Sequence, residues 1–443
     1  MHLQTSQFLT EERNIARLEA LSQVLDLPSR VDTLYLSIPH AFMDKVASRA
    51  IRPAPSLQRL VLMSNGYDFP RDFLGGVAPL LTTLYLRHCG LAVDSPLLYN
   101  IISLNIEGHA QGSNFAARLC EVLRLMPSLE YLDIHDIYPN PPADTAIASL
   151  PKLRKLNLRC IFPSCTAMLE HISFPATTFV QIDIANPSLL DIDEEDLSSM
   201  WTSVARILAP DFHPEGQRIV RTVAAEGDGE FRATSFTLMM WELKVSNTST
   251  PLPSPNLLVM LDWTDREENA LANPVFFEEV FQAAFSALPL PHLETLHLGC
   301  FPKEAMSKFG LFKRALRPHL WSSTLQTLIL HVEHCVEYLP AMLVHQPDNG
   351  PLPLPALETL LFTSVKFDRR IVERLVRSLR TRSDQGVKLR KVIMDGGCAN
   401  EAGRAMYSFR EAVEHVEWSF SSQELDYSAD EYSDTDSDSG SSA

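Results

Sequence analysis

Long apolar runs and an excess of basic residues are both missing from this sequence of 443 residues. No apolar segment approaches the roughly 18 residues that a membrane-spanning helix needs, and the first ten residues have neither the basic nor the apolar region of a secretory signal. We therefore expect a soluble intracellular protein, in the cytoplasm, the nucleus or both. The net charge of −17 disfavours binding to nucleic acid or to an anionic membrane.

Cysteine is scarce, and the seven residues present are an odd number without a secretory signal. Both facts argue against a disulfide framework. Cys89, Cys160 and Cys300 come just after leucines of predicted strands, where a small and weakly polar side chain suits a buried turn. We expect them to pack rather than to react.

Motifs for catalysis and cofactor binding are also missing. The sequence has no P-loop, no G-x-G-x-x-G after a strand, no G-x-S-x-G and no H-E-x-x-H. We therefore predict no enzyme, no catalytic residue, no cofactor and no metal site. Two groups of three Cys and His residues could be considered as zinc ligands. Zinc binding is disfavoured because their spacing is unusual and a fourth ligand is lacking. The groups are Cys160, Cys165 and His171, and His331, His334 and Cys335.

A repeated strand motif is the strongest feature that is present. Residues 81–89 read L-x-x-L-x-L-x-x-C, the strand signature of a leucine-rich repeat. Related segments recur from Val31 to Ile184, and the steps between their middle apolar residues fall within the repeat length of this class, roughly 20 to 29 residues. The middle residues are Leu34, Leu60, Leu84, Leu104, Leu132, Leu156 and Ile182.

A second set of strand motifs repeats at a longer and constant interval, which leaves room for a full helix on the return path. Its middle residues are Leu296, Leu328, Leu360 and Val392, and we expect return helices at 303–316, 336–344 and 371–382. Proline stands two residues before the first leucine of six motifs, where it would end a helix and fix an extended backbone. These prolines are Pro55, Pro79, Pro127, Pro151, Pro291 and Pro355.

The repeat signature lapses between the two sets, in residues 187–290. Helices are predicted at Glu194–Leu208 and Val275–Leu288, and strands at Arg218–Ala224, Ser235–Val245 and Leu257–Asp262. Two interpretations remain open here, irregular repeats with long loops or an inserted domain.

The predicted fold class is α/β: a leucine-rich-repeat solenoid, curved like a horseshoe, with a parallel sheet on the concave face and helices and loops on the convex face. The repeat domain spans 1–418, with regular repeats at about 11–186 and 291–398 and an initial helix at Glu11–Leu27. A capping helix is expected at about 399–416. Residues 419–443 form an acidic tail, rich in Ser and Asp, that is expected to be disordered.

The tail is acidic, whereas the helix predicted at 371–382 and the residue before it are rich in arginine. From Ser421 onward the chain has seven acidic residues and no Lys or Arg. The helix is expected to show a solvated basic face; a second interpretation is that the tail folds back on it, strengthened by phosphorylation. Candidate phosphorylation sites are Ser433, Thr435, Ser437 and Ser439. The basic residues are Arg370, Arg374, Arg377, Arg380 and Arg382.

Partner binding is predicted on the concave face. Because leucines at alternate strand positions face the core, the residues between them line the open side of the sheet. Tyrosine and arginine, which often dominate protein interfaces, are common at these positions. The predicted face comprises Tyr35, Arg59, Tyr85, Arg87, Glu107, Tyr131, Asp133, His135, Lys155 and Arg159.

Several phrases resemble the fungal F-box/leucine-rich-repeat proteins. They are Pro-Ser-Leu-x-x-Leu-x-Leu and the segments 72–79, 94–98 and 171–175, and the resemblance covers roughly residues 11–416. It implies that the repeats hold a protein substrate, while an amino-terminal F-box docks on the adaptor subunit of a cullin ubiquitin ligase.

No F-box is visible, because only about thirty residues precede Val31 and they already read as a repeat helix. Either the gene model is truncated or this member lacks the docking module. The sequence therefore favours a noncatalytic protein-binding receptor, with adaptor binding only if an F-box exists upstream. Two alternatives are an enzyme with its site in 187–290 and a truncated fragment with no partner-binding role.

Overall fold

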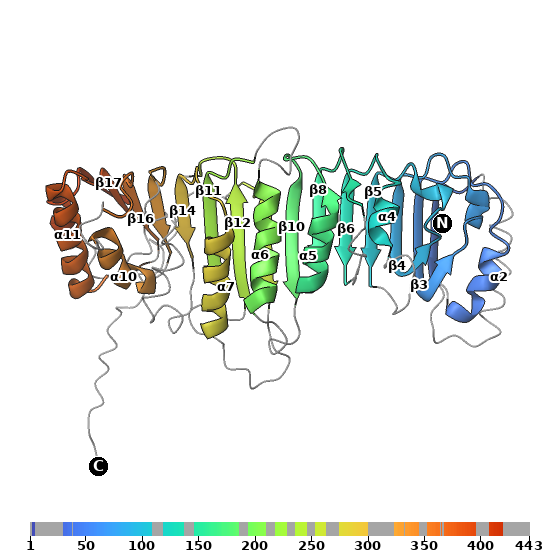
Figure 1. Cartoon of the computed structure of the whole chain (residues 1–443). Helices are drawn as coiled ribbons and strands as arrows, with labels where there is room; N and C mark the ends of the chain where they lie inside the picture. The colour runs from blue at the N-terminus through green and yellow to red at the C-terminus, as the bar shows by residue number, and fades with distance from the viewer. Residues whose placement is uncertain are drawn as a thin grey trace, which may run out of the picture. The chain divides into compact units, whose positions relative to one another are not determined.

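The computed structural model describes most of the chain. The described residues are 2–4, 30–37, 39–108, 118–136, 146–185, 194–209, 218–227, 235–245, 253–262, 274–299, 323–331, 333–344, 352–363, 365, 367–395 and 407–419. They form an α/β structure with a large, mostly parallel sheet and helices (Figure 1). Among them, no helix has the length and apolar character needed to cross a membrane.

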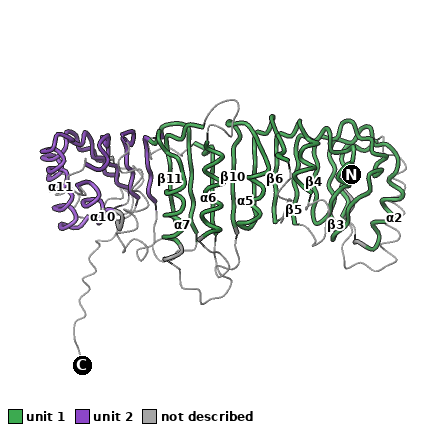
Figure 2. The backbone as a smooth tube through the Cα atoms, viewed as in Figure 1, with its two compact units in different colours: residues 1–244, 253–293, 301–318 green, residues 245–252, 294–300, 319–443 purple. Residues whose placement is uncertain are grey.

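The chain divides into two compact units (Figure 2). Unit 1 comprises residues 1–244, 253–293 and 301–318, and unit 2 comprises 245–252, 294–300 and 319–443. The predicted initial helix, the return helix at 303–316 and the acidic tail lie outside the described residues.

The first eight strands described in the sheet of unit 1 run parallel to one another, and seven of them are the predicted leucine motifs. Leucines at alternate positions, such as Leu84 and Leu86, are fully buried, while the residues between them are half-buried or exposed. Strand β1, which pairs with β2, was not predicted. The strands in order are β1 (His2–Gln4), β2 (Thr33–Ser37), β3 (Arg59–Phe69), β4 (Thr83–Leu91), β5 (Ser103–Glu107), β6 (Tyr131–His135), β8 (Lys155–Arg159) and β10 (Phe179–Ala185).

Helices cover one face of this sheet (Figure 1). They are short in the first repeats, where the return path leaves little room, and longer from α5 onward. They are η2 (His40–Phe42), α2 (Met43–Ala47), η3 (Phe73–Gly76), η4 (Pro96–Leu98), α4 (Leu119–Leu123), α5 (Phe162–His171), α6 (Glu194–Leu208) and α7 (Pro274–Ala287). A separate pair of short strands, β7 (Ala148–Ser149) and β9 (Ile172–Ser173), lies between these elements.

The repeated proline has a more specific role than the extended conformation expected for it. In the turn before β3, the Leu57 amide donates to the Ala54 carbonyl at 3.1 Å, so Pro55 occupies the second position of a hydrogen-bonded turn. That position favours proline because its ring fixes the required φ. The same bond recurs before each of the other five prolines' motifs, from Leu81, Leu129, Leu153, Leu293 and Leu357.

The alignment predicted for the last regular strand, β10, is wrong by two residues. The motif predicted Ile182 as the equivalent of Leu156, but Val180 pairs with Leu156 and Ile182 pairs with Leu158. The period-2 pattern allows both alignments, because a shift of two residues leaves the same side chains buried. With this register the step from Leu156 to Val180 equals the step from Leu132 to Leu156.

The irregular region contributes three strands to the sheet of unit 1. Strands β11 (Thr222–Gly227), β12 (Ser235–Trp241) and β13 (Leu257–Asp262) form an antiparallel meander, and β13 pairs in parallel with β10. The sheet order after β10 is therefore β13, β12, β11. Helices α6 and α7 confirm the two predicted helices. The strand predicted at Leu257–Asp262 is present with the same ends, and the other two are present with shifted ends. Their antiparallel order departs from the parallel repeat.

The described residues of unit 2 form five parallel strands and two long helices. The strands are β14 (Thr295–Leu298), β15 (Thr327–Leu330), β16 (Thr359–Phe362), β17 (Lys391–Asp395) and β18 (His415–Ser419), each paired with the next. The return helices predicted at 336–344 and 371–382 are present as α10 (Glu333–Val344) and α11 (Arg369–Asp384). The capping helix expected at 399–416 is wrong at its end, because β18 replaces its last residues and only 407–410 are helical within the described part.

Candidate functional site

Strands β2 to β10 present a polar surface on the side away from their buried leucines, which we call the open face. The parallel register aligns equivalent positions of neighbouring strands, so the side chains form rows across the sheet. The middle row is Tyr35, Val61, Tyr85, Asn105, Asp133, Asn157 and Gln181. The row nearest the strand ends is Ser37, Met63, Arg87, Glu107, His135, Arg159 and Asp183.

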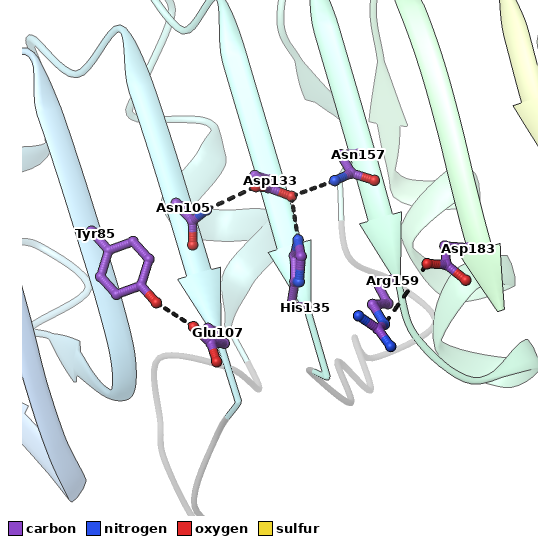
Figure 3. A network of polar contacts seen from close by, with 8 residues as sticks. All are labelled: Tyr85, Asn105, Glu107, Asp133, His135, Asn157, Arg159 and Asp183. Atoms are coloured by element: carbon purple, nitrogen blue, oxygen red, sulfur yellow. Dashed lines mark hydrogen bonds and ion pairs between the residues drawn. The ribbon is translucent and has the colours of Figure 1, made fainter. Parts of the chain in front are cut away.

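Asp133 is the centre of a hydrogen-bond network on this face (Figure 3). Its Oδ2 accepts from Asn105 Nδ2 at 2.8 Å, and its Oδ1 accepts from Asn157 Nδ2 at 2.8 Å. His135 Nε2 lies 2.6 Å from the same Oδ1. One carboxylate thus joins side chains from three neighbouring strands, and ionised acceptors make shorter and stronger hydrogen bonds than neutral ones.

A second cluster lies beside it, on β4 and β5. The Tyr85 hydroxyl donates to Glu107 Oε2, and Arg87 Nε lies 3.3 Å from Glu107 Oε1. Burial, together with the hydrogen bond to Glu107, raises the pKa of Tyr85 to about 12. The phenol therefore keeps its proton throughout the physiological range, and Glu107 has both oxygens engaged.

A separate ion pair joins β8 and β10 on the same face. Arg159 Nε lies 3.8 Å from Asp183 Oδ2 (Figure 3). Partial burial raises the pKa of Asp183, while the charge of Arg159 opposes that rise. Because most charges of the open face are paired with one another, its side chains are held in fixed positions before any partner arrives.

Tyr131, Lys155 and Phe179 occupy the first open-face positions of β6, β8 and β10 and pair in register with one another. Tyr131 retains 43% of its surface, and the Lys155 ammonium lies 5.7 Å from the centre of the Phe179 ring. A cation over an aromatic face is an exposed contact of modest strength. These three neighbouring side chains offer apolar area that the Asp133 network lacks.

Residues with positive φ lie within β4 and directly after the ends of β5 and β6. His88, Gly108 and Asp136 have φ of 51°, 53° and 52°. A Cβ on Gly108 would come within 2.3 Å of the His88 ring, so a larger residue would displace that ring, and the positive φ also favours glycine here. The Gly108 amide donates to the His135 carbonyl at 2.8 Å, which fixes the backbone beside the network.

All ten residues predicted for the partner-binding face lie at outward-facing positions of β2 to β8. Whether they bind a partner stays a prediction. Sequence reasoning missed Asn105, Asn157, Asp183 and Phe179, although the same alternation of strand positions places them on this face. The prediction omitted them because it favoured tyrosine and charged residues of the first strands.

The cysteine and histidine groups have structural partners where they are described. Cys160 and Cys165 are buried, and a hydrogen bond between their thiols together with burial raises the pKa of Cys165 well above its usual value. His171 Nδ1 lies 2.8 Å from the Ala167 carbonyl of its own helix. Over the described part of the chain, no three His, Cys, Asp or Glu residues are grouped as a metal would require. The side chains of His334 and Cys335 lie outside the described set.

One cavity of about 570 Å³ lies beside the irregular region, between α5 and α6. Its lining consists of Glu170, Glu195, Ser198, Ser199, Thr202 and Ser203. This lining brings carboxylates and hydroxyls together without a histidine or cysteine. It does not reproduce the nucleophile and base pairing on which acyl-transfer sites depend.

Comparison with known proteins leaves this geometry as the main guide to function. No protein-family model and no curated protein matches the chain.

Replacing Asp133 with asparagine should destabilise unit 1 by about 1–2 kcal/mol, because two amide donors and His135 would share a neutral acceptor in place of a carboxylate. The measurement is urea unfolding followed by hydrogen–deuterium exchange of unit 1 peptides. Asp136→Asn is the matched control, since Asp136 is exposed at the end of the same strand. Equal unfolding free energies for the two variants would contradict a structural role for the network.

Proposed function

We propose that this chain is a noncatalytic leucine-rich-repeat solenoid that binds a protein partner on the open face of β2 to β10. The repeat length, the seven motif strands and the parallel register support the solenoid interpretation. The single observation that supports the binding function best is the Asp133-centred network, which holds polar side chains of three strands in fixed positions.

Preorganised side chains favour binding because little conformational entropy remains to be lost when a partner docks. The network supplies directional polar groups, and Tyr131 with the Lys155–Phe179 pair supplies apolar area at its margin. Interfaces combine these two elements, with aromatic anchors carrying much of the energy. The partner is therefore expected to present polar backbone or side-chain groups beside an apolar segment.

The repeat phrases further support a substrate-receptor role like that of F-box/leucine-rich-repeat proteins. In that role the open face would hold the protein to be ubiquitinated. Adaptor binding would require an F-box, and none is visible in the sequence. Copurification of the full chain with purified cullin-ligase adaptor subunit tests this part separately. A complex that survives gel filtration would support it, and its absence would leave the chain as an adaptor-independent binder.

A triple variant tests the binding face directly. Tyr85→Ala, Arg87→Ala and Tyr131→Ala together should lower recovery of partners in quantitative affinity capture at least ten-fold, because interface anchors of this kind contribute about 2 kcal/mol or more.

The matched control removes one leucine, one tyrosine and one arginine that are exposed elsewhere in unit 1: Leu80→Ala, Tyr99→Ala and Arg124→Ala. It should retain the wild-type partners. Circular dichroism confirms that both variants are folded. Indistinguishable partner profiles for the wild type and the open-face variant would refute the proposal.

A further inference from the structure

Helix α11 of unit 2 carries a row of arginines on its solvent side, and we propose that this row binds the acidic carboxyl-terminal segment of the same chain, residues 420–443. The row consists of Arg370, Arg374 and Arg377, which we call the arginine ridge. All three are exposed. The spacing of four and three residues places them on one face, over about 10 Å of helix.

Burial of the opposite side fixes the direction of the ridge. Ile371, Val372, Leu375, Val376 and Leu379 are buried and pack α11 into unit 2. Arg382, which the sequence analysis assigned to the basic face, is also buried and donates to three backbone carbonyls. The basic face is therefore narrower than predicted, and its direction is set by the apolar side of the helix.

Neighbouring arginines already have partners, but the ridge does not. Arg369 Nε lies 2.8 Å from Glu373 Oε1, and Arg380 pairs with Glu411. Within the described part of the chain, no hydrogen bond or ion pair engages the ridge side chains. Three guanidinium groups without carboxylate partners make a local positive surface on a protein whose net charge is −17.

The ridge also begins at the amino terminus of α11, the end of a helix at which negative charge is favourable. Arg369 and Arg370 occupy the first turn of α11, where the N-cap Asp368 is engaged by the Ile371 amide and no acidic residue lies in the turn itself. The helix macrodipole makes cations unfavourable there, at a cost of a few tenths to about 1 kcal/mol each. An anionic segment laid along this face would relieve that cost and pair with the free guanidinium groups.

The carboxyl-terminal segment has the complementary charge. It contains seven acidic residues and no Lys or Arg. Three of the acidic residues alternate with Ser433, Thr435, Ser437 and Ser439 in the run from Ser433 to Ser439. Phosphate groups at these hydroxyls would each add nearly two negative charges and further acceptor oxygens for arginine.

The segment is attached close enough to reach the ridge. It follows β18, which belongs to the same unit as α11, and Glu411 at the start of the turn into β18 already pairs with Arg380. Twenty-four residues can span up to about 80 Å when extended, several times the length of the ridge. A tether of this length keeps the segment at an effective concentration near the millimolar range.

Nuclear magnetic resonance on the full chain tests the proposal. Binding to the folded body would broaden the amide resonances of residues 430–439, so their intensities at 25 mM NaCl should be less than half of those at 500 mM NaCl. Arg370→Gln, Arg374→Gln and Arg377→Gln together should restore full intensity at low salt. A control with the same loss of charge elsewhere, Arg30→Gln, Arg124→Gln and Lys152→Gln, should leave the broadening in place.

Equal intensities at the two salt concentrations would overturn the proposal, as would full restoration by the control variant.

A second measurement separates the tail from other occupants. A fluorescent peptide of residues 427–443, phosphorylated at Ser433, Thr435 and Ser437, should bind at least ten-fold more tightly when the seven acidic residues of the tail are replaced by amides. If the peptide binds the wild type and the amide variant with equal affinity, the tail does not occupy the ridge. Tighter binding of a 20-base-pair DNA than of the phosphopeptide would make the ridge a nucleic-acid site.

Discussion

Replacing Arg382 with methionine should lower the free energy of unfolding of unit 2 by about 3 kcal/mol. Arg382 lies in the last turn of α11 and has no exposed surface. Its Nη1 donates to the Leu343 and Pro353 carbonyls at 3.1 and 2.6 Å, and its Nη2 donates to the Leu354 carbonyl at 2.8 Å. One side chain thereby ties α11 to the end of α10 and to the segment before β16.

Two opposing terms decide the size of this effect. Burial lowers the pKa of Arg382 to about 10, which corresponds to roughly 3 kcal/mol spent on holding the charge in place. Three hydrogen bonds from a charged donor contribute roughly 1.5–3 kcal/mol each, and their loss leaves buried carbonyls without this donor. The hydrogen bonds therefore outweigh the cost of the charge, and a methionine of similar length recovers only packing.

The comparison is Arg377→Met, which changes an exposed arginine of the same helix and should stay within about 0.5 kcal/mol of wild type. Urea unfolding followed by hydrogen–deuterium exchange of unit 2 peptides measures both. If Arg382→Met is as stable as Arg377→Met, the guanidinium does not hold these segments together.

Arg382 also shows what the sequence could have revealed about α11. It stands twelve residues after Arg370, which is about 120° around the helix from the ridge and on the side of Leu375 and Leu379. Helical spacing alone therefore predicts that it faces inward. Counting it among the solvated arginines followed from its charge, since arginine is rarely buried without a carboxylate partner.

The regular strands were predictable because each carries its own signal. Two buried apolar residues separated by one position, such as Leu132 and Ile134, identify the buried side of a strand wherever it lies in the sheet. Strand order has no such local signal. That β13 pairs with β10, ahead of β12 and β11, depends on contacts between distant segments. The pairing of β1 with β2 and of β18 with β17 depends on such contacts too.

The open face shows the same division. Alternation places Asp133 and Asn157 outward, but only the register of three neighbouring strands puts both asparagine amides beside one carboxylate. A single strand gives no reason to prefer asparagine over a tyrosine or an arginine as a candidate. The residues of the face were therefore predictable, and the network among them was not.

Lowering the pH from 7 to 4.5 should destabilise unit 2 by about 2–3 kcal/mol through His297. This side chain on β14 is 1% exposed, and its Nε2 lies 3.3 Å from the Val245 carbonyl. Its ring stacks on that of His331, with 6.2 Å between ring centres. Burial lowers the pKa of His297 to about 4, the Val245 carbonyl opposes that change, and His331 adds to it. Burial lowers the pKa of His331 as well.

The sign follows from proton binding. Between pH 6.5 and about 4, the unfolded chain binds a proton at His297 and the folded chain does not, so acidification favours unfolding. The contribution is absent above pH 6.5 and reaches about 3 kcal/mol near pH 4, since each pKa unit corresponds to about 1.36 kcal/mol. His297→Leu removes the titrating group, so its unit 2 should lose less stability than wild type over this range.

The exposed His415 on β18 of unit 2 supplies the control, because His415→Gln should keep the pH dependence of wild type. Urea unfolding at pH 7.0 and 4.5, resolved by hydrogen–deuterium exchange of unit 2 peptides, gives the two free-energy differences. A pH effect of the same size in His297→Leu and in wild type would mean that the destabilisation comes from carboxylates. A smaller effect in His297→Leu alone would assign it to the buried ring, because both variants lose one histidine and only one of them loses it from the interior.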